Sequence, residues 1–194
     1  MPESLPPTTL AMGDVAETRK VFYISSLIRL TLLLLYLALM GPLPFLAQAT
    51  QAAIPPVGLI VAIGLGWAGL YGALSQRVEV DSGGIEVAYP AWVRWLWRGG
   101  WRLPWTQVRS LKPRSTGQGG IVYYLVGGDQ QAYLLPMRVA GFARLVEIVE
   151  TYTGIDTQDI KPLAQPWMYI ILLGFTLLLL LVDAWTITTA LQMT

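Results

Sequence analysis

The chain has 194 residues, of which 54% are hydrophobic and 13% are charged, and its formal net charge is +1. This balance is too apolar for an ordinary soluble domain and indicates an integral membrane protein. A net charge near zero argues against nucleic-acid binding, which needs many unopposed Lys and Arg side chains. The chain has no Cys and no His, which excludes disulfides, thiol nucleophiles, imidazole bases and metal sites built from those side chains.

Three apolar segments have the length and composition of membrane-spanning helices. Phe22 to Met40 contains one charge and is long enough to cross a hydrocarbon core of about 30 Å. Gly41 to Pro44 is expected to end this helix, because proline cannot continue the backbone hydrogen-bond ladder. The second apolar segment is Val57 to Gln76 and the third is Trp167 to about Leu191.

The distribution of basic residues predicts how the helices are oriented. Arg19, Lys20 and Arg29 lie at the start of the first helix, whereas the connection 41–56 carries no charge. Basic residues favour the cytoplasmic side, so we expect a cytoplasmic N-terminus and a C-terminus on the opposite side. The predicted regions are a polar cytoplasmic N-terminus (1–21), two transmembrane helices (22–76), a cytoplasmic domain (77–163) and a third transmembrane helix (164–194).

The segment between the second and third helices has the alternating pattern of antiparallel strands. Arg77 to Asp81 and Ile85 to Tyr89 alternate around Ser82 to Gly84, which is a hairpin signal. Further strands are expected at Gln107–Leu111, Ile121–Val126 and Ala132–Leu135. After Pro136 the period becomes helical, and Gly154 is expected to end this helix. The apolar face of the helix consists of Val139, Phe142, Leu145, Val146 and Val149.

Three stretches of this segment carry a resemblance to a known family: GIEV (84–87), LPWTQVRSL (103–111) and GFARLVEIVETYTGI (141–155). Their order resembles the bacterial pleckstrin-homology-like (PH-like) domains that are carried on membrane helices. Two helices followed by such a domain also resemble assembly factors of photosynthetic complexes, in thylakoids and in purple bacteria. The resemblance implies an antiparallel PH-like domain closed by one C-terminal helix, in the thylakoid or bacterial inner membrane. Together with the three apolar segments, the expected fold is an integral membrane α+β protein in which this domain is inserted among three transmembrane helices, one more than in the thylakoid assembly factor.

The second apolar segment contains Gly64-Leu-Gly-Trp-Ala-Gly69, which matches the G-x-G-x-x-G pattern of dinucleotide-binding loops. That pattern needs a preceding strand and a helix N-terminus open to water, and here it lies inside an apolar helix. Small residues at such spacing instead allow another helix to approach closely. The expected packing face consists of Gly58, Ala62, Gly66, Gly69 and Ala73.

Two ionisable residues, Arg29 and Asp183, lie inside the apolar segments and are candidates for a function there. The helical rise places them near opposite membrane surfaces, so we do not expect them to pair. The long stem of Arg29 can return its guanidinium to the headgroup level. For Asp183 two interpretations remain, a polar partner on another chain or simple exposure at the interface.

The stretch YPAWVRWLWRGGWRLPW (89–105) holds five of the eight tryptophans of the chain. We expect it to form a loop of the domain that contacts the bilayer surface or a protein partner, while Trp105 fills the core. Six basic residues and no acidic one lie between Val87 and Gly128, which suits anionic lipid or an acidic partner. The predicted interface residues are Trp92, Arg94, Trp95, Trp97, Arg98, Trp101 and Arg102.

The function expected from these features is a non-catalytic assembly or accessory factor of a larger membrane protein complex. No nucleophile motif, phosphate loop or metal spacing occurs in the sequence, so we expect neither a metal nor a cofactor. Two alternatives stay open: a lipid-sensing or membrane-organising module that binds anionic headgroups, and a permanent subunit of a membrane complex.

Overall fold

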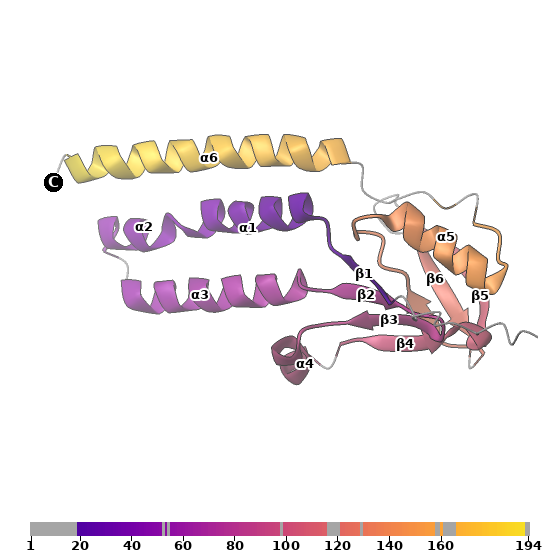
Figure 1. Ribbon diagram of the computed structural model, residues 1–194. Coiled ribbons are helices and arrows are strands. Elements are labelled where there is room, and N and C mark those ends of the chain that lie inside the picture. Colours follow the sequence, from indigo (N-terminus) through magenta and orange to yellow (C-terminus); the bar gives the residue numbers. More distant parts are fainter. Residues whose placement is uncertain are drawn as a thin grey trace, which may run out of the picture.

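The computed structural model describes residues 19–51, 53, 55–97, 99–115, 121–128, 130–157, 160 and 166–192. Long helices lie side by side at one end of the molecule, and two β-sheets with a covering helix form the other end (Figure 1). The C-terminus lies at the end of the helices that is distant from the sheets (Figure 1). We call these two parts the helical region and the sheet domain.

The first sheet is antiparallel and has four strands in the order β1-β2-β3-β4. These strands are β1 (Lys20–Tyr23), β2 (Arg77–Val80), β3 (Gly84–Ala88) and β4 (Trp101–Pro104). In the β1–β2 pair Phe22 lies opposite Val78, although two long helices separate these strands in the sequence. A helical hairpin is therefore inserted between the first two strands of the sheet, and the pairing of β1 with β2 holds both of its ends together.

The predicted hairpin between β2 and β3 is confirmed, and the side chain of Asp81 stabilises its turn. Asp81 Oδ1 accepts hydrogen bonds from the backbone N–H groups of Gly83 and Gly84, both at 2.9 Å. Such a bond from Asp to the backbone two residues on is typical of tight turns. The indole Nε1 of Trp105 donates to the carbonyl oxygen of Asp81 at 2.9 Å. The same turn therefore fixes the position of a core tryptophan.

The second sheet is also antiparallel, with three strands in the order β5-β6-β7. These strands are β5 (Val108–Ser115), β6 (Ile121–Gly127) and β7 (Ala132–Leu134). A short 3-10 helix, η1 (Trp105–Gln107), connects the two sheets. Tyr123 and Leu125 of β6 are buried, and the residues that alternate with them, Val122, Tyr124 and Val126, are more exposed, as expected for a strand with one face on the core. The three strands expected here are confirmed, with shifts at their ends.

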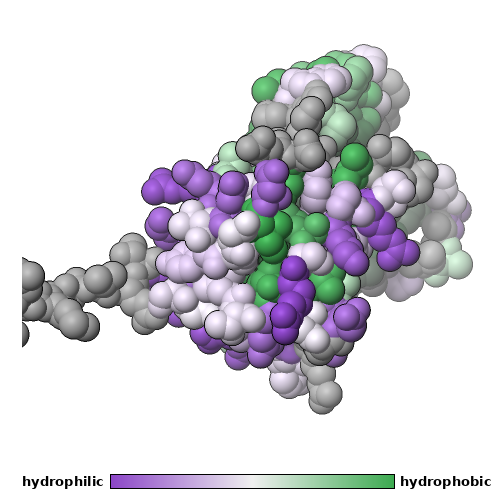
Figure 2. Space-filling view, turned by 90° about the vertical axis from the view of Figure 1, so that its right-hand side faces the viewer, coloured by the Kyte–Doolittle hydropathy of each residue, from purple (hydrophilic) through white to green (hydrophobic). Residues whose placement is uncertain are grey.

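Helix α5 (Phe142–Thr153) closes the core of the sheet domain, as predicted. It ends at Gly154, whose φ of +68° suits glycine and whose N–H donates to the carbonyl oxygen of Glu150 at 2.7 Å. Four residues at helical spacing face the core: Phe142, Leu145, Val146 and Val149. Seen from the end opposite the helices, the sheet domain has hydrophilic side chains bordering a strip of hydrophobic ones (Figure 2).

The helical region consists of α1 (Ser26–Met40), α2 (Leu43–Ala49), α3 (Pro56–Ala73) and α6 (Pro166–Gln192). Within the described residues, three helical segments are long and apolar enough to cross a membrane: Ser26–Ala49, Pro56–Ala73 and Trp167–Thr189. Helix α1 packs against both α3 and α6 and lies between them (Figure 1). These segments agree with the three apolar helices expected from the sequence.

The first helix begins later than predicted, and a further short helix follows it. Helix α1 begins at Ser26 instead of Phe22, because Lys20 to Tyr23 pair as β1 and the Phe22 ring is buried in the sheet core. The boundary predicted between residues 21 and 22 therefore cuts through a strand. Helix α1 ends at Met40 as expected, but the chain then forms α2. Proline is tolerated there because the first turn of a helix needs no N–H donor at that position.

Candidate functional site

The Trp/Arg stretch forms a short helix, α4 (Ala91–Trp97), followed by strand β4, so the prediction of a loop is wrong. The helix begins after Pro90, whose carbonyl oxygen accepts the N–H of Arg94 at 3.0 Å. Gly100 has a φ of +131°, and a Cβ there would lie 2.8 Å from the carbonyl oxygen of Val87. Only glycine fits this turn, which directs the chain from α4 into β4.

Helix α4 packs against the last turn of α3, where the helical region meets the sheet domain. A Cβ at Gly72 of α3 would lie 2.7 Å from Cη2 of Trp92 and 3.0 Å from Cγ2 of Val93. Val93 is buried, whereas Trp92 is 46% exposed and Trp95 is 87% exposed. One side of α4 therefore contacts α3, and large aromatic side chains of the same short helix remain uncovered at the helix-to-sheet junction.

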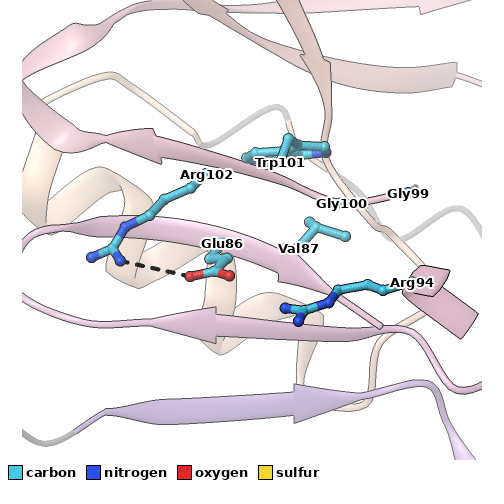
Figure 3. Close-up of a pocket in the computed structure, with 7 residues that line it drawn as sticks. All are labelled: Glu86, Val87, Arg94, Gly99, Gly100, Trp101 and Arg102. Atoms are coloured by element: carbon cyan, nitrogen blue, oxygen red, sulfur yellow. Dashed lines mark ion pairs between the residues drawn. The ribbon is translucent and has the colours of Figure 1, made fainter. Parts of the chain in front are cut away.

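An open pocket of about 400 Å³ lies between α4 and the β3–β4 part of the first sheet (Figure 3). The guanidinium of Arg102 lies 3.4 Å from Asp81 Oδ2 and 3.8 Å from Glu86 Oε2. Arg94 extends from α4 on the other side of the Glu86 carboxylate and, within the described part of the chain, has no ion pair or hydrogen bond through its side chain. The pocket is lined by Glu86, Val87, Arg94, Gly99, Gly100, Trp101 and Arg102.

The remaining tryptophans of the stretch have different surroundings. Trp101 is half-buried on β4, with its ring centroid 5.2 Å from that of Tyr133, and it packs against the core of the sheet domain. Trp105 is buried and stacks on Tyr152 at 5.1 Å, as its predicted core role requires, although it lies in η1 and not in a strand. Trp97 is the last residue of α4, and Arg98 lies outside the described residues.

Tyr89 lies between β3 and α4 and is half-buried against the core of the sheet domain. Burial raises the pKa of its phenol, because removing the group from water disfavours the phenolate. The phenol therefore stays neutral at physiological pH. The charges around α4 in the described residues come from Arg94, from Arg102 of β4 and from the carboxylates of the neighbouring strands.

The basic residues between Val87 and Gly128 do not form one surface. Arg109, Lys112 and Arg114 are exposed on β5, which lies in the part of the sheet domain distant from the helices (Figure 1). No ion pair involves these three residues within the described ranges. Only Arg94 and Arg102 flank the pocket beside α4, so the structure divides the predicted basic stretch into two separate regions.

Arg29 and Asp183 lie in different places, and no ion pair joins them in the described part of the structure. The guanidinium carbon of Arg29 lies 5.7 Å from the centre of the Tyr71 ring of α3, a cation–π geometry. Asp183 is half-buried on α6, and its Oδ2 is buried with no hydrogen-bond partner among the described residues. Arg29 therefore joins α1 to α3, and the buried Oδ2 of Asp183 has no donor among the described residues.

Only one glycine of the predicted small-residue face makes a close contact between helices. A Cβ at Gly66 would overlap the Tyr36 hydroxyl of α1, which donates a hydrogen bond to the Ile63 carbonyl oxygen at 2.9 Å. A Cβ at Gly58 would meet only its neighbour Pro55, and one at Gly69 would meet nothing within 4 Å. Ala62 is exposed and Ala73 is half-buried.

The close contact between Gly72 and α4 was not predicted from the sequence. The only local signal is the position of Gly72 in the glycine-rich run that continues from Gly69, and that signal does not distinguish one glycine from another. The described residues contain no group of three or more Asp or Glu side chains that could hold a metal ion. Three features therefore remain as candidate sites. They are the pocket beside α4, in which Arg102 has carboxylate partners and Arg94 has none among the described residues, the two exposed tryptophans of α4, and the largely exposed surface of α3.

These features define the class of the molecule: an α+β protein with three helices apolar enough to span a membrane, two antiparallel sheets and a closing helix. No family model matches the chain, and no solved structure matches it. The chain is 50% identical over 181 residues to "Uncharacterized protein slr0269" of the cyanobacterium Synechocystis sp., which covers 92% of this chain and 91% of that protein. It belongs to the same family as this cyanobacterial protein.

Proposed function

We propose that the three long helices cross a membrane and that the sheet domain lies on the cytoplasmic side. Their side chains support this, because the apolar surfaces of α3 and α6 are uncovered over most of their length. The charges also support it, since Arg19, Lys20 and Arg77 lie at the sheet-domain end of the helices. Residues 41–56, at the opposite end, have no charge.

The sheet domain is proposed to be PH-like. Its order of four strands, three strands and one closing helix supports this, as does the packing of α5 over a core shared by both sheets. In this interpretation the first strand precedes the membrane hairpin and the second follows it. The domain is therefore assembled from residues on both sides of the two inserted helices, which couples its folding to the arrangement of those helices.

The function that these features support best is that of a non-catalytic assembly or accessory factor of a larger membrane protein complex. The observation that carries this proposal is the surface of α3, whose only buried residue is Gly72. Gly58, Ala62 and Gly69 leave a shallow face on this helix to which a helix of another protein can approach closely. We propose a photosynthetic complex, in a thylakoid or plasma membrane, as the candidate partner; the relative described above comes from a cyanobacterium.

A second candidate function, membrane organisation through anionic headgroups, is favoured by the exposed tryptophans of α4 and by Arg94, which has no ion pair among the described residues. The two functions differ in what remains bound after mild solubilisation. An assembly factor retains a protein complex, whereas a lipid-binding module retains lipid alone.

Copurification of the tagged full chain from its native membranes in mild detergent tests the proposed function. We expect a large complex present in less than equimolar amount, because an assembly factor leaves the finished complex. Ala62→Leu should reduce the recovered complex, because the larger side chain obstructs the shallow face of α3. Val61→Leu, at a neighbouring exposed position that is already large, is the matched control and should have no effect. An equimolar complex would indicate a permanent subunit, and recovery of no protein would contradict both roles.

Labelling of single cysteines tests the proposed topology without background, because the chain has no cysteine. Ser115→Cys on β5 should react with a membrane-impermeant reagent only from the cytoplasmic side. Thr50→Cys, which follows α2 at the opposite end of the helices, should react only from the other side. Labelling of Ser115→Cys only from the outer side would overturn the topology.

A further inference from the structure

We propose that the pocket beside α4 binds the phosphate of an anionic lipid headgroup, with Arg94 as its cationic ligand. The proposal rests on the membrane insertion described above and adds a ligand class and a binding residue to it. Soluble phosphates share the chemistry of the headgroup, and we assign the site to lipid because of its position in the fold.

The position of α4 follows from its contact with α3. Trp92 and Val93 pack on Gly72, which lies one residue before the end of α3 at Ala73. If α3 spans the bilayer, this contact holds α4 at the boundary between hydrocarbon and water. Trp92 and Trp95 are exposed there, and tryptophan favours this depth because its large ring is apolar and its N–H is polar. The open side of the pocket then lies among headgroups.

The two arginines of the pocket differ in their ion pairs. Arg102 divides its guanidinium between Asp81 and Glu86, whereas Arg94 has no carboxylate partner in the described ranges. Arg94 is therefore the arginine of the lining that has no carboxylate partner among the described residues. A guanidinium offers several N–H donors in a plane and binds phosphate oxygens through charge-assisted hydrogen bonds. A phosphate bound at Arg94 would supply the anionic partner that Arg102 already has in Asp81 and Glu86.

The walls of the pocket leave room for such a ligand. Its volume is about 400 Å³, and it is open on one side. Gly99 and Gly100 have no side chains, so a ligand can approach the backbone where the chain turns from α4 into β4 (Figure 3). The pairing of Arg102 with Glu86 keeps that carboxylate occupied, which reduces its repulsion of a phosphate.

The test uses the full chain reconstituted in phosphatidylcholine vesicles that contain a minor fraction of brominated lipid, whose bromine atoms quench nearby tryptophans. Brominated phosphatidylglycerol and brominated phosphatidylcholine are compared at equal mole fraction. We expect the protein to associate with the anionic lipid about fivefold more strongly, which is the effect of one basic side chain near a membrane surface. Arg94→Gln should abolish this preference, so that the ratio of association with the two lipids falls to about one. Unchanged quenching of this variant by brominated phosphatidylcholine would show that it is inserted.

Arg114→Gln is the matched control, because it removes the same charge from an exposed, unpaired arginine on β5, distant from the helices. It should keep the full preference. A preference that survives in Arg94→Gln, or is lost equally in Arg114→Gln, would overturn the assignment to Arg94. A preference abolished by excess soluble phosphate would assign the pocket to free anions and overturn the lipid site.

The remaining outcomes separate this inference from the proposed membrane insertion. Equal quenching of the unmodified protein by the two lipids would contradict the headgroup site and leave the insertion intact. Absence of quenching by either lipid would contradict the insertion itself.

Discussion

The sheet domain and the helical region are both rich in apolar side chains but differ in where those side chains lie. In the sheet domain Ile85, Leu125 and Leu145 are completely buried. In the helical region Leu181 is 68% exposed and Phe175 is 67% exposed. Both lie on α6, which has no acidic residue in its first turn and no basic residue in its last turn. Apolar content alone therefore does not distinguish a protein core from a surface suited to lipid.

The distinction lies in the periodicity of the sequence, as α5 and α6 illustrate. The buried residues of α5 recur at helical spacing, and Glu147 and Glu150 stay outside the core. Helix α6 is apolar on all sides, which is typical of a helix surrounded by apolar material. A helix with apolar side chains on one side is suited to a boundary between protein and water. A helix with apolar side chains all around is suited to a hydrocarbon environment.

Matched leucine truncations give the largest expected effect and test this comparison directly. Leu125→Ala leaves a cavity in the core of the sheet domain, where Leu125 is 0% exposed, so we expect the free energy of unfolding to fall by about 2–5 kcal/mol. Leu178→Ala removes the same atoms from α6, where Leu178 is 57% exposed, and should change stability by less than about 0.5 kcal/mol. Thermal unfolding in detergent, followed by near-ultraviolet circular dichroism, measures both.

Equal losses for the two variants would contradict the comparison. In that case the outer face of α6 would be covered by a second copy of the chain, and the unfolding temperature would depend on protein concentration. A control with Leu178→Val, which keeps most of the side chain, should be indistinguishable from the unmodified protein.

The elements that sequence patterns predicted well are those whose signal is local. The sequences of β2 and β3 alternate between apolar and polar residues, β6 is a short run of β-branched and aromatic residues, and α5 has an amphipathic period that ends at Gly154. Such patterns can be recognised within a few neighbouring residues. The strand β1 was missed because its four residues merge with the apolar run that follows and because its partner β2 is distant in the sequence. Only the folded structure brings the two strands together.

Only part of the candidate site was predicted, because only part of it has a local signal in the sequence. Composition located the Trp/Arg stretch, and Pro90 with Gly100 could have indicated a short helix with a turn after it. No local pattern shows that Trp101 packs on Tyr133, that Arg102 is engaged by Asp81, or that Arg94 lacks a carboxylate. These properties depend on contacts between elements, which the spacing of residues along the chain does not specify.

A smaller effect is expected from two glycines of α3, and it refines the comparison within the helical region. Gly66→Leu places a side chain where the Tyr36 hydroxyl lies, so it must displace that ring and break its hydrogen bond to the Ile63 carbonyl. We expect the stability in detergent to fall by about 1–2 kcal/mol, the range measured for polar contacts between membrane helices. Gly69→Leu makes the same chemical change where a Cβ meets nothing within 4 Å, and it should leave stability unchanged.

Tyr36→Phe separates the two contributions to the effect at Gly66. It removes the hydroxyl without adding bulk, so Gly66→Leu should cost less in the Tyr36→Phe background than in the unmodified protein. Equal costs in the two backgrounds would mean that the loss arises elsewhere on α3, and the Tyr36 contact would then have no role in joining α1 to α3. Destabilisation by Gly69→Leu as large as that by Gly66→Leu would attribute both losses to the helix itself. The helical region would then lack the specific internal contact that distinguishes its α1–α3 side from its exposed apolar faces.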